Sequence, residues 1–217
     1  MTRALEIRDA AAAAACIPGW MQPRELHWLA DRAARLREPA TWYELGSWCG
    51  RSAYAVGTLL PPGSRLVLVD IFEPRQRDWP APMGEPDDRL DPCDPRSIQR
   101  YLERVTMPAI AARNGIAMEL RVGPSVPTAA AVSDGKADAV FIDAGHELDE
   151  VLADIAAWAP KLKPGGLFAG HDYAPEWPGV IEAVDAMLPE RRLLEGSGIW
   201  YVDRFVNGDR LHVSAVR

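Results

Sequence analysis

Two short stretches of the sequence bring acids and histidines together. His146 follows Asp143 by three residues, and His171 stands directly before Asp172. Carboxylates, together with water, suit a hard divalent cation such as Mg²⁺. A histidine beside such a cation could be a ligand or a base that works near neutral pH. Asp143 could instead cap the following helix, and His171-Asp172 could be a polar loop.

A glycine-containing loop forms a second candidate site. The segment Glu44-Leu-Gly46-Ser-Trp-Cys-Gly50-Arg-Ser52 follows a short β-type run, and Asp70 ends the next one. The glycine spacing matches neither the dinucleotide fingerprint nor a phosphate loop. A carboxylate at the position of Asp70 can accept hydrogen bonds from both hydroxyls of a ribose. The combination predicts a nucleoside ligand without a pyrophosphate, although an ordinary turn and a helix cap remain alternatives.

These residues must be positioned by alternating strands and helices. Apolar runs of β type predict strands at Thr41–Leu45, Arg65–Ile71, Met118–Val122, Ala137–Asp143 and Leu167–Gly170. Helical patterns predict helices at Gly50–Leu60, Ser97–Asn114, Val126–Val132, Leu148–Leu162 and Val180–Met187. This order predicts an α/β, Rossmann-like, mostly parallel sheet with helices on both faces. Ligands of such sheets bind at the carboxyl ends of the strands, where the acids fall.

The remaining segments extend this minimal sheet. Residues 1–40 are expected to be a helical segment, with an amphipathic helix over Pro23–Leu36. The stretch 72–96 is rich in Pro, Asp and Arg and is expected to be a lid-like loop. Pro108 is expected to kink or split its helix. At the C-terminal end, Ile199–Val206, Asn207-Gly208 and Leu211–Val216 predict an antiparallel hairpin.

Length and composition narrow the class of protein. The 217 residues suit a single domain over 1–217, and the net charge of −7 argues against nucleic-acid binding. The sequence has no apolar stretch long enough to span a bilayer, so we expect no membrane partner. Three cysteines without disulfide or metal spacing favour reduced thiols and a cytoplasmic location.

The glycine loop and its acid resemble the class I S-adenosylmethionine-dependent methyltransferases. Glu44 to Ser52 looks like their first motif, Asp70 like their ribose-binding acid, and Val122 to Ser125 like their adenine segment. The resemblance implies a seven-stranded sheet whose last strand is antiparallel, with Leu193-Leu194 as the candidate sixth strand. It also implies S-adenosylmethionine as cofactor, held by Glu44, Gly46, Ser47, Ser52, Asp70, Ile71, Ser125 and Asp143.

The stretch Phe141 to Tyr173 is similar to a particular subgroup. This subgroup comprises the metal-dependent O-methyltransferases of sugars and other natural-product hydroxyls, together with the cephalosporin hydroxylase-like proteins. The matching residues include Asp143, His146, Asp154, Trp158 and Gly170-His-Asp-Tyr173. The resemblance implies Mg²⁺ held by Asp143, Asp172 and His171. Some relatives have two acids where this chain has His171-Asp172, so metal dependence is implied less firmly than the cofactor.

The expected function is therefore O-methylation of a hydroxyl on a small molecule or sugar, assisted by a divalent metal. His146 would take the proton of the acceptor hydroxyl, with Asp143 as the second catalytic residue. The expected partner is the small-molecule acceptor, and a homodimer is compatible with the helix Pro23–Leu36. Two alternatives remain: a non-catalytic nucleoside- or partner-binding protein on the same fold, and an NAD-dependent oxidoreductase, which the missing third glycine disfavours.

Overall fold

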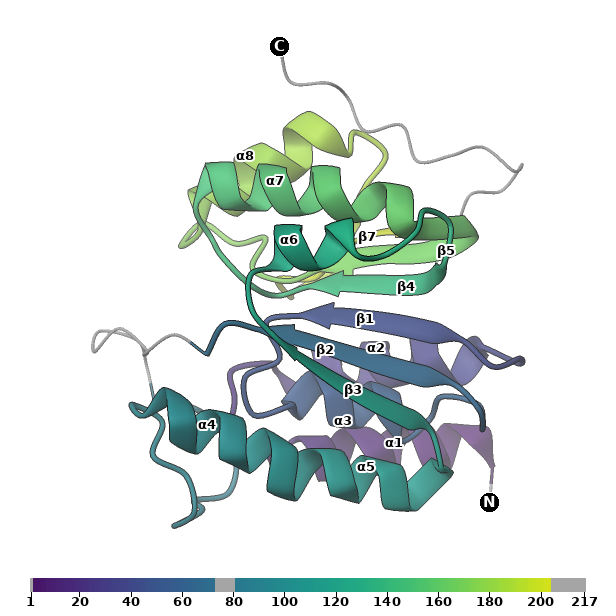
Figure 1. Ribbon diagram of the computed structural model, residues 1–217, viewed down its shortest axis with the longest axis vertical. Helices are drawn as coiled ribbons and strands as arrows, with labels where there is room; N and C mark the ends of the chain where they lie inside the picture. Colours follow the sequence, from purple (N-terminus) through teal and green to yellow (C-terminus); the bar gives the residue numbers. More distant parts are fainter. Residues whose placement is uncertain (1, 73–80, 204–217) are drawn as a thin grey trace. The chain divides into compact units, whose positions relative to one another are not determined.

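Seven strands form the sheet of this protein (Figure 1). The computed structural model describes residues 2–72 and 81–203. The strands lie in the order β3-β2-β1-β4-β5-β7-β6. Their bounds are β1 Thr41–Leu45, β2 Arg65–Asp70, β3 Ala117–Val122, β4 Ala137–Ile142, β5 Leu162–Gly170, β6 Arg192–Leu193 and β7 Trp200–Asp203.

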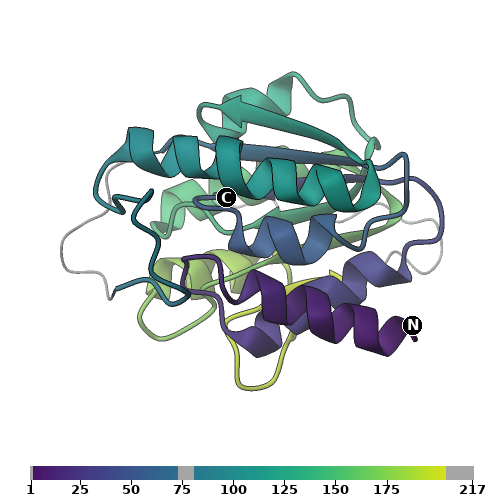
Figure 2. The ribbon, with the colours of Figure 1, turned by 90° about the horizontal axis from the view of Figure 1, so that it is seen from below.

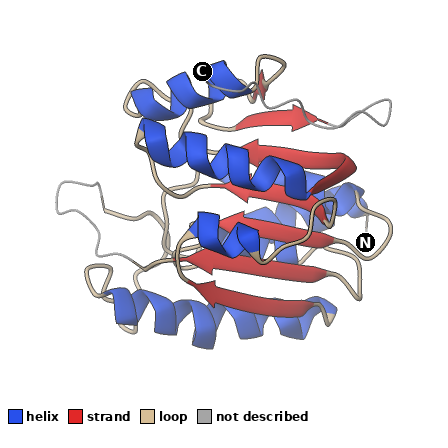
Figure 3. Ribbon diagram, turned by 45° about the horizontal axis from the view of Figure 1, so that its top comes forward, coloured by secondary structure: helices blue, strands red, loops and turns tan. Residues whose placement is uncertain are grey.

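Parallel pairing dominates the sheet, and its end is antiparallel. β2 pairs in parallel with β3, and β4 pairs in parallel with both β1 and β5. β7 runs antiparallel to β5 and to β6. The predicted fold class is therefore confirmed: an α/β, Rossmann-like, mostly parallel sheet of seven strands flanked by helices (Figure 3). The candidate sixth strand is also confirmed, one residue earlier than expected.

The chain groups into two compact units. Unit 1 comprises Met1–Ala40 and Ser47–Val122, and unit 2 comprises Thr41–Gly46 and Gly123–Arg217. The division falls inside the glycine loop, between residues 46 and 47 of the sequence. The expectation of a single domain over 1–217 stays a prediction.

Unit 1 contains β2, β3 and the helices α1 to α5. Figure 2 shows α1 beside α2, and both helices also pack on α3. The described helices of this unit are α1 Arg3–Ala14, α2 Pro23–Arg35, α3 Arg51–Gly57, α4 Pro95–Tyr101 and α5 Met107–Asn114. The expected N-terminal helical segment is thus present, and α3 is shorter than the predicted helix over Gly50–Leu60.

Helix α2 shows how the local sequence defines an element. Pro23 occupies the first turn, where its missing N–H costs no hydrogen bond. The side chains of Gln22 and Glu25 form a reciprocal capping box at the helix start. Leu26 and Leu29 are completely buried on one face, as the amphipathic pattern predicts.

Pro108 divides the expected helix over Ser97–Asn114 without breaking it. A π-helical turn, η1, spans Leu102–Thr106 between α4 and α5. Its wider backbone lets the N–H of Met107 bond the carbonyl of Leu102, five residues earlier. A proline inside an α-helix clashes with the carbonyl four residues before it, and the π-turn relieves this conflict.

Unit 2 contains β1, β4, β5, β7 and β6 with three helices. α6 spans Ser125–Ala130, α7 spans Leu148–Trp158 and α8 spans Pro178–Met187, and α7 packs on both others. Trp158, Phe168 and Trp200 are among its largest fully buried side chains. The prediction of a helix up to Leu162 was wrong. A 3₁₀ turn, η2, follows at Ala159–Lys161, and Leu162 opens β5 because Pro160 ends the α-helical hydrogen bonding.

Two expected features lie partly or wholly outside the described residues. Of the lid-like loop 72–96, residues 72 and 81–96 are described. Residues 81–94 hold no helix or regular strand, but the predicted end of the loop was wrong, because Pro95 and Arg96 already belong to α4. Met83 forms a two-bond bridge with Gly19, which joins this segment to the α1–α2 connection. The turn Asn207-Gly208 and the strand Leu211–Val216 lie outside the described residues. No helix among the described residues is long and apolar enough to span a membrane.

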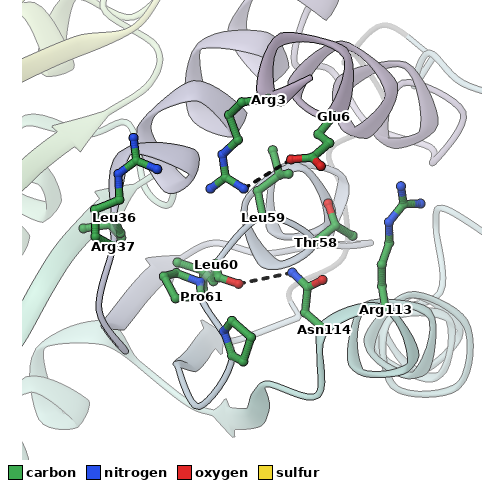
Figure 4. A pocket seen from close by; sticks show the side chains of 11 residues that line it. Arg3, Glu6, Leu36, Arg37, Thr58, Leu59, Leu60, Pro61, Arg113 and Asn114 are labelled. Atoms are coloured by element: carbon green, nitrogen blue, oxygen red, sulfur yellow. Dashed lines mark hydrogen bonds and ion pairs between the residues drawn. The ribbon is translucent and has the colours of Figure 1, made fainter. Parts of the chain in front are cut away.

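An open hollow of about 470 Å³ lies at the C-terminal ends of α2, α3 and α5 in unit 1 (Figure 4). The side-chain amide of Asn114 donates to the carbonyls of Gly57 and Leu60 at the end of α3. Arg3 donates to the carbonyl of Ala34 in the last turn of α2. Cationic and amide donors suit helix C-termini, whose terminal carbonyls lack partners within the helix. The lining residues are Arg3, Glu6, Leu36, Arg37, Thr58, Leu59, Leu60, Pro61, Pro62, Arg113 and Asn114.

Candidate functional site

Asp70 organises the unit 1 part of the site. It is the last residue of β2, and its two carboxylate oxygens accept the backbone N–H groups of Trp48 and Phe72, each at 2.7 Å. Burial raises the pKa of Asp70 above its ordinary value, and the backbone donors only partly oppose this effect. A half-buried carboxylate with a perturbed pKa at a strand end is typical of a functional site.

Unusual backbone conformations surround Asp70. Trp48 has a φ of 45° and Phe72 a φ of 50°, both in the left-handed region that side chains disfavour. Such residues cost on the order of 1 kcal/mol or more each, and they persist where the surrounding structure requires them. Asp70 accepts the N–H of both residues, so the carboxylate holds the two strained segments in place.

Three other predicted cofactor residues lie in the same unit. The Ser47 side chain is 4% exposed, and its hydroxyl has no hydrogen-bond partner among the described residues. Ser52 is buried in the first turn of α3. Ile71 is 48% exposed directly after Asp70. A buried hydroxyl without a partner carries an energetic penalty that a ligand can relieve.

Glu44 and Gly46 lie in unit 2, at the end of β1. The Glu44 side chain is completely buried, and Glu44 is in register with Phe141 of β4. Gly46 has a φ of 79°, and a Cβ atom there would overlap the carbonyl oxygen of Asp143. Only glycine allows this close approach of two backbone segments.

The acids and histidines of unit 2 form a hydrogen-bonded cluster. Nε2 of His146 lies 2.8 Å from Oδ2 of Asp172, and Nδ1 of His171 lies 3.1 Å from the other oxygen of Asp172. Nδ1 of His171 is also 3.6 Å from Oδ1 of Asp143. Asp172 has a φ of 61°. The structure therefore brings together Asp143, His146, His171 and Asp172, as the sequence predicted from the ends of β4 and β5.

Burial and mutual charge shift the pKa values in this cluster. Burial, together with the neighbouring charge of Asp172, raises the pKa of Asp143, while the histidines oppose the shift. Burial alone would raise the pKa of Asp172, but hydrogen bonds from His146 and His171 hold it below its ordinary value. Burial opposes protonation of His146, yet the hydrogen bond to Asp172 raises its pKa overall. Asp172 therefore carries the negative charge that stabilises a protonated His146.

Trp177 contacts the cluster, although the sequence reasoning matched it to the O-methyltransferase subgroup without giving it a role in the site. Its ring stacks on the imidazole of His146 with centroids 3.9 Å apart and an interplanar angle of 17°. A Cβ atom at Gly179 would come within 2.6 Å of the carbonyl oxygen of His146. The segment Trp177-Pro-Gly179 thus lies flat against His146. The Trp-Pro-Gly sequence signals a tight approach, but it does not reveal which residue is approached.

Ser125, the last predicted cofactor residue, belongs to a separate network. Its hydroxyl donates to Oδ1 of Asp154 at 2.5 Å and accepts the indole N–H of Trp158 at 2.9 Å. Asp154 is 6% exposed, and burial raises its pKa. The Ser125 side chain therefore faces α7, and its backbone N–H at the start of α6 is the group that a ligand could contact.

The donor set of the cluster fits a divalent cation. Asp143, His171 and Asp172 each offer one ligand atom, and these atoms lie within 4.8 Å of one another. A bound cation would also compensate the unfavourable charge of the half-buried Asp143 carboxylate. Both oxygens of Asp172 already accept bonds from histidines, so ligation would use their remaining lone pairs. None of these residues lines the hollow at the ends of α2, α3 and α5.

Comparison with known proteins identifies the class. A family model described as a methyltransferase domain matches residues 43–173, which include the glycine loop, Asp70 and the acid–histidine cluster. No curated protein matches the chain significantly. The match covers more than half of the chain, and the chain therefore belongs to this methyltransferase family. Its enzymatic nature follows, and the nicotinamide oxidoreductase and non-catalytic alternatives lose their support.

Solved structures share the fold. Cofactor-bound Rv0187 from MTB has a TM-score of 0.60 and 17% identity, with 95% of this chain and 92% of that chain covered. The O-methyltransferase TomG from Streptomyces achromogenes, in complex with SAM, has a TM-score of 0.56 and 16% identity over 92% and 90%. CalS11, a TDP-rhamnose 3'-O-methyltransferase, has a TM-score of 0.51 and 19% identity over 84% and 77%. Fold and family together confirm the predicted class I S-adenosylmethionine-dependent methyltransferase.

Proposed function

We propose that this methyltransferase transfers the methyl group of S-adenosylmethionine to a hydroxyl oxygen of a small molecule, with sugar hydroxyls as the first acceptor class. The observation that carries this proposal is the half-buried acid–histidine cluster in unit 2, where Asp172 holds His146 by a hydrogen bond of 2.8 Å. An alcohol needs a base as it attacks the methyl group, and this pair supplies one. Two proteins of similar fold are named O-methyltransferases, one of them acting on TDP-rhamnose.

Candidate cofactor residues lie in each unit and are described here unit by unit. In unit 1, Asp70 would accept bonds from the ribose hydroxyls, and the partnerless Ser47 hydroxyl would contact the ligand. Ser52 and Ile71 complete this set, and the exposed Ile71 side chain would pack against the nucleoside. Unit 2 would contribute Glu44, Gly46, Ser125 and Asp143.

His146 would remove the proton of the acceptor hydroxyl. Because Asp172 accepts a hydrogen bond from Nε2, the lone pair of the neutral imidazole is on Nδ1. As the acceptor oxygen forms its bond to the methyl carbon, the carbon–sulfur bond breaks and the hydroxyl proton moves to Nδ1. Neutral S-adenosylhomocysteine leaves, and Asp172 stabilises the imidazolium. Trp177 keeps the ring orientation by stacking on its face.

Asp143, His171 and Asp172 would hold a divalent cation, with Mg²⁺ as the expected ion. When bound, such a cation lowers the pKa of a coordinated hydroxyl and fixes its position. A small-molecule hydroxyl acceptor, a homodimer and a cytoplasmic location also stay predictions.

The cofactor assignment predicts a large effect at Asp70. Asp70→Asn should weaken S-adenosylhomocysteine binding by about 100-fold or more, because it removes a charged acceptor of two hydrogen bonds. Calorimetric titration measures the affinity. Asp138→Asn is the matched control, because Asp138 also accepts a backbone N–H, from Thr41 at 2.8 Å, and has no proposed ligand role. Equal affinity of the wild type and Asp70→Asn would contradict the assignment.

The metal assignment predicts sensitivity to chelation. Exhaustive EDTA treatment should lower turnover, and Mg²⁺ should restore it, because the acid–histidine cluster would lose its cation. Asp143→Asn should abolish calorimetric Mg²⁺ binding to the protein without substrates. Full activity after chelation, together with no Mg²⁺ binding by the wild type, would reject the metal and leave His146 as a metal-free base.

A further inference from the structure

The hydroxyl of Thr106 makes an unusual contact for a helical threonine. Thr58, the C-cap of α3, and Thr128, within α6, each donate to the carbonyl four residues earlier, at 2.8 Å. Thr106 instead donates to the carbonyl of Cys49, 57 residues away, at 2.7 Å. Thr106 closes the π-turn, where the carbonyl of Leu102 accepts the N–H of Met107. The hydroxyl therefore bonds the glycine loop rather than its own helix.

The π-turn also supports this loop by direct packing. A Cβ atom at Gly50 would lie 2.7 Å from Cδ1 of Leu102 and 2.7 Å from Cγ2 of Thr106. Gly50 has a φ of 81° and precedes the first residue of α3. The Thr106 side chain is 1% exposed, and Leu102 is completely buried. One face of the π-turn thus packs against the glycine loop at Gly50, directly before α3 begins.

The contacted carbonyl lies between the strained residues of the loop. Cys49 stands between Trp48 at a φ of 45° and Gly50 at a φ of 81°. Asp70 holds one side of this segment by accepting the N–H of Trp48 at 2.7 Å. Thr106 holds the other side by donating to the carbonyl of Cys49, two peptide groups further along the chain. Left-handed residues such as Trp48 keep their conformation only when neighbouring groups constrain them.

We propose that Thr106, presented by the π-turn, is a positioning residue for the cofactor-binding loop. Its hydroxyl and methyl group hold residues 47–50 in the conformation that receives S-adenosylmethionine. The inference rests on the proposed function of this loop. π-Turns inside α-helices are frequently found at functional sites, and here the turn has a defined contact to such a site.

Calorimetric titration with S-adenosylhomocysteine tests the inference on four proteins: wild type, Thr106→Val, Thr106→Ser and Thr58→Val. Thr106→Val keeps the volume and removes the hydroxyl, so affinity should fall about 5- to 10-fold. Thr106→Ser keeps the hydroxyl and should remain within about 2-fold of the wild type. Thr58→Val is the matched control, because Thr58 is also a buried threonine, 3% exposed, whose hydroxyl donates to a backbone carbonyl at the end of α3. It should bind like the wild type while its Tm falls as much as that of Thr106→Val.

The outcomes distinguish cofactor binding by the loop from the positioning role of Thr106. No binding by the wild type would contradict the proposed cofactor loop itself. Wild-type binding with unchanged affinity of Thr106→Val would overturn the positioning role alone. Equal loss of affinity in Thr58→Val and Thr106→Val would show a general effect of stability and would also overturn it. If Thr106→Val is insoluble, Thr106→Ala compared with Thr106→Ser separates the hydroxyl in the same way.

Discussion

Replacing His146 with glutamine should lower kcat by about two to four orders of magnitude and leave S-adenosylhomocysteine affinity nearly unchanged. The glutamine amide can still donate to Asp172, as Nε2 of His146 does at 2.8 Å. It has no basic nitrogen, so the acceptor proton has no receiver in the proposed mechanism. Initial-rate kinetics with saturating cofactor measure the effect once an acceptor is found.

A second histidine provides the control for this experiment. His27 is exposed on α2, so His27→Gln should leave kcat and affinity unchanged. His146→Gln could instead retain full kcat while the protein stays folded and still binds S-adenosylhomocysteine. That result would exclude His146 from the proton-transfer step. A parallel loss of affinity and kcat would instead indicate that His146 acts mainly in binding.

Alanine at Gly46 should destabilise the fold by several kcal/mol, a loss comparable with the total stability of many domains. Two effects add at this position. The φ of 79° disfavours any side chain by about 1–2 kcal/mol. The new methyl group would also overlap the carbonyl oxygen of Asp143, and the overlap involves backbone that cannot move independently. We expect a large fall in Tm or loss of soluble protein.

Gly165 separates these two effects. It has a φ of 82°, close to that of Gly46, but no atom lies within 4 Å of its Cβ position. Gly165→Ala should therefore cost only the conformational term, about 1–2 kcal/mol. Chemical denaturation of both variants measures the difference. Equal losses would show that the backbone relaxes at Gly46 and that the close approach to Asp143 is not essential.

Much of the fold was predictable because short-range signals determine it. Gly46 and Gly50 were singled out by their positions after a strand, and both have left-handed backbones in the structure. Apolar runs ending in Asp70 and Asp143 placed these acids at strand ends, since a buried strand stops where polar residues begin. The boundary near Pro160 was predicted wrongly, because a proline can end a helix or follow its end.

The sequence identified candidate residues of the site but not the contacts between them. The sequence places Asp172 among candidate metal ligands, yet its two hydrogen bonds to His146 and His171 come from tertiary structure. The stacking of Trp177 and the Thr106 contact to Cys49 join residues whose separation follows no local pattern. Such pairings depend on how elements pack, and neither periodicity nor propensity encodes them.

The sulfur atom of Cys49 gives the cofactor loop a chemical reporter of its own. The side chain is completely buried, and burial, with the charges of Asp70 and Asp87, raises the pKa of its thiol. Alkylating reagents attack the thiolate, so Cys49 reacts only when the loop opens, whereas Cys16 and Cys93 are exposed. The slow phase of thiol labelling therefore records the opening frequency of the loop, and the two fast thiols calibrate the reagent in the same sample.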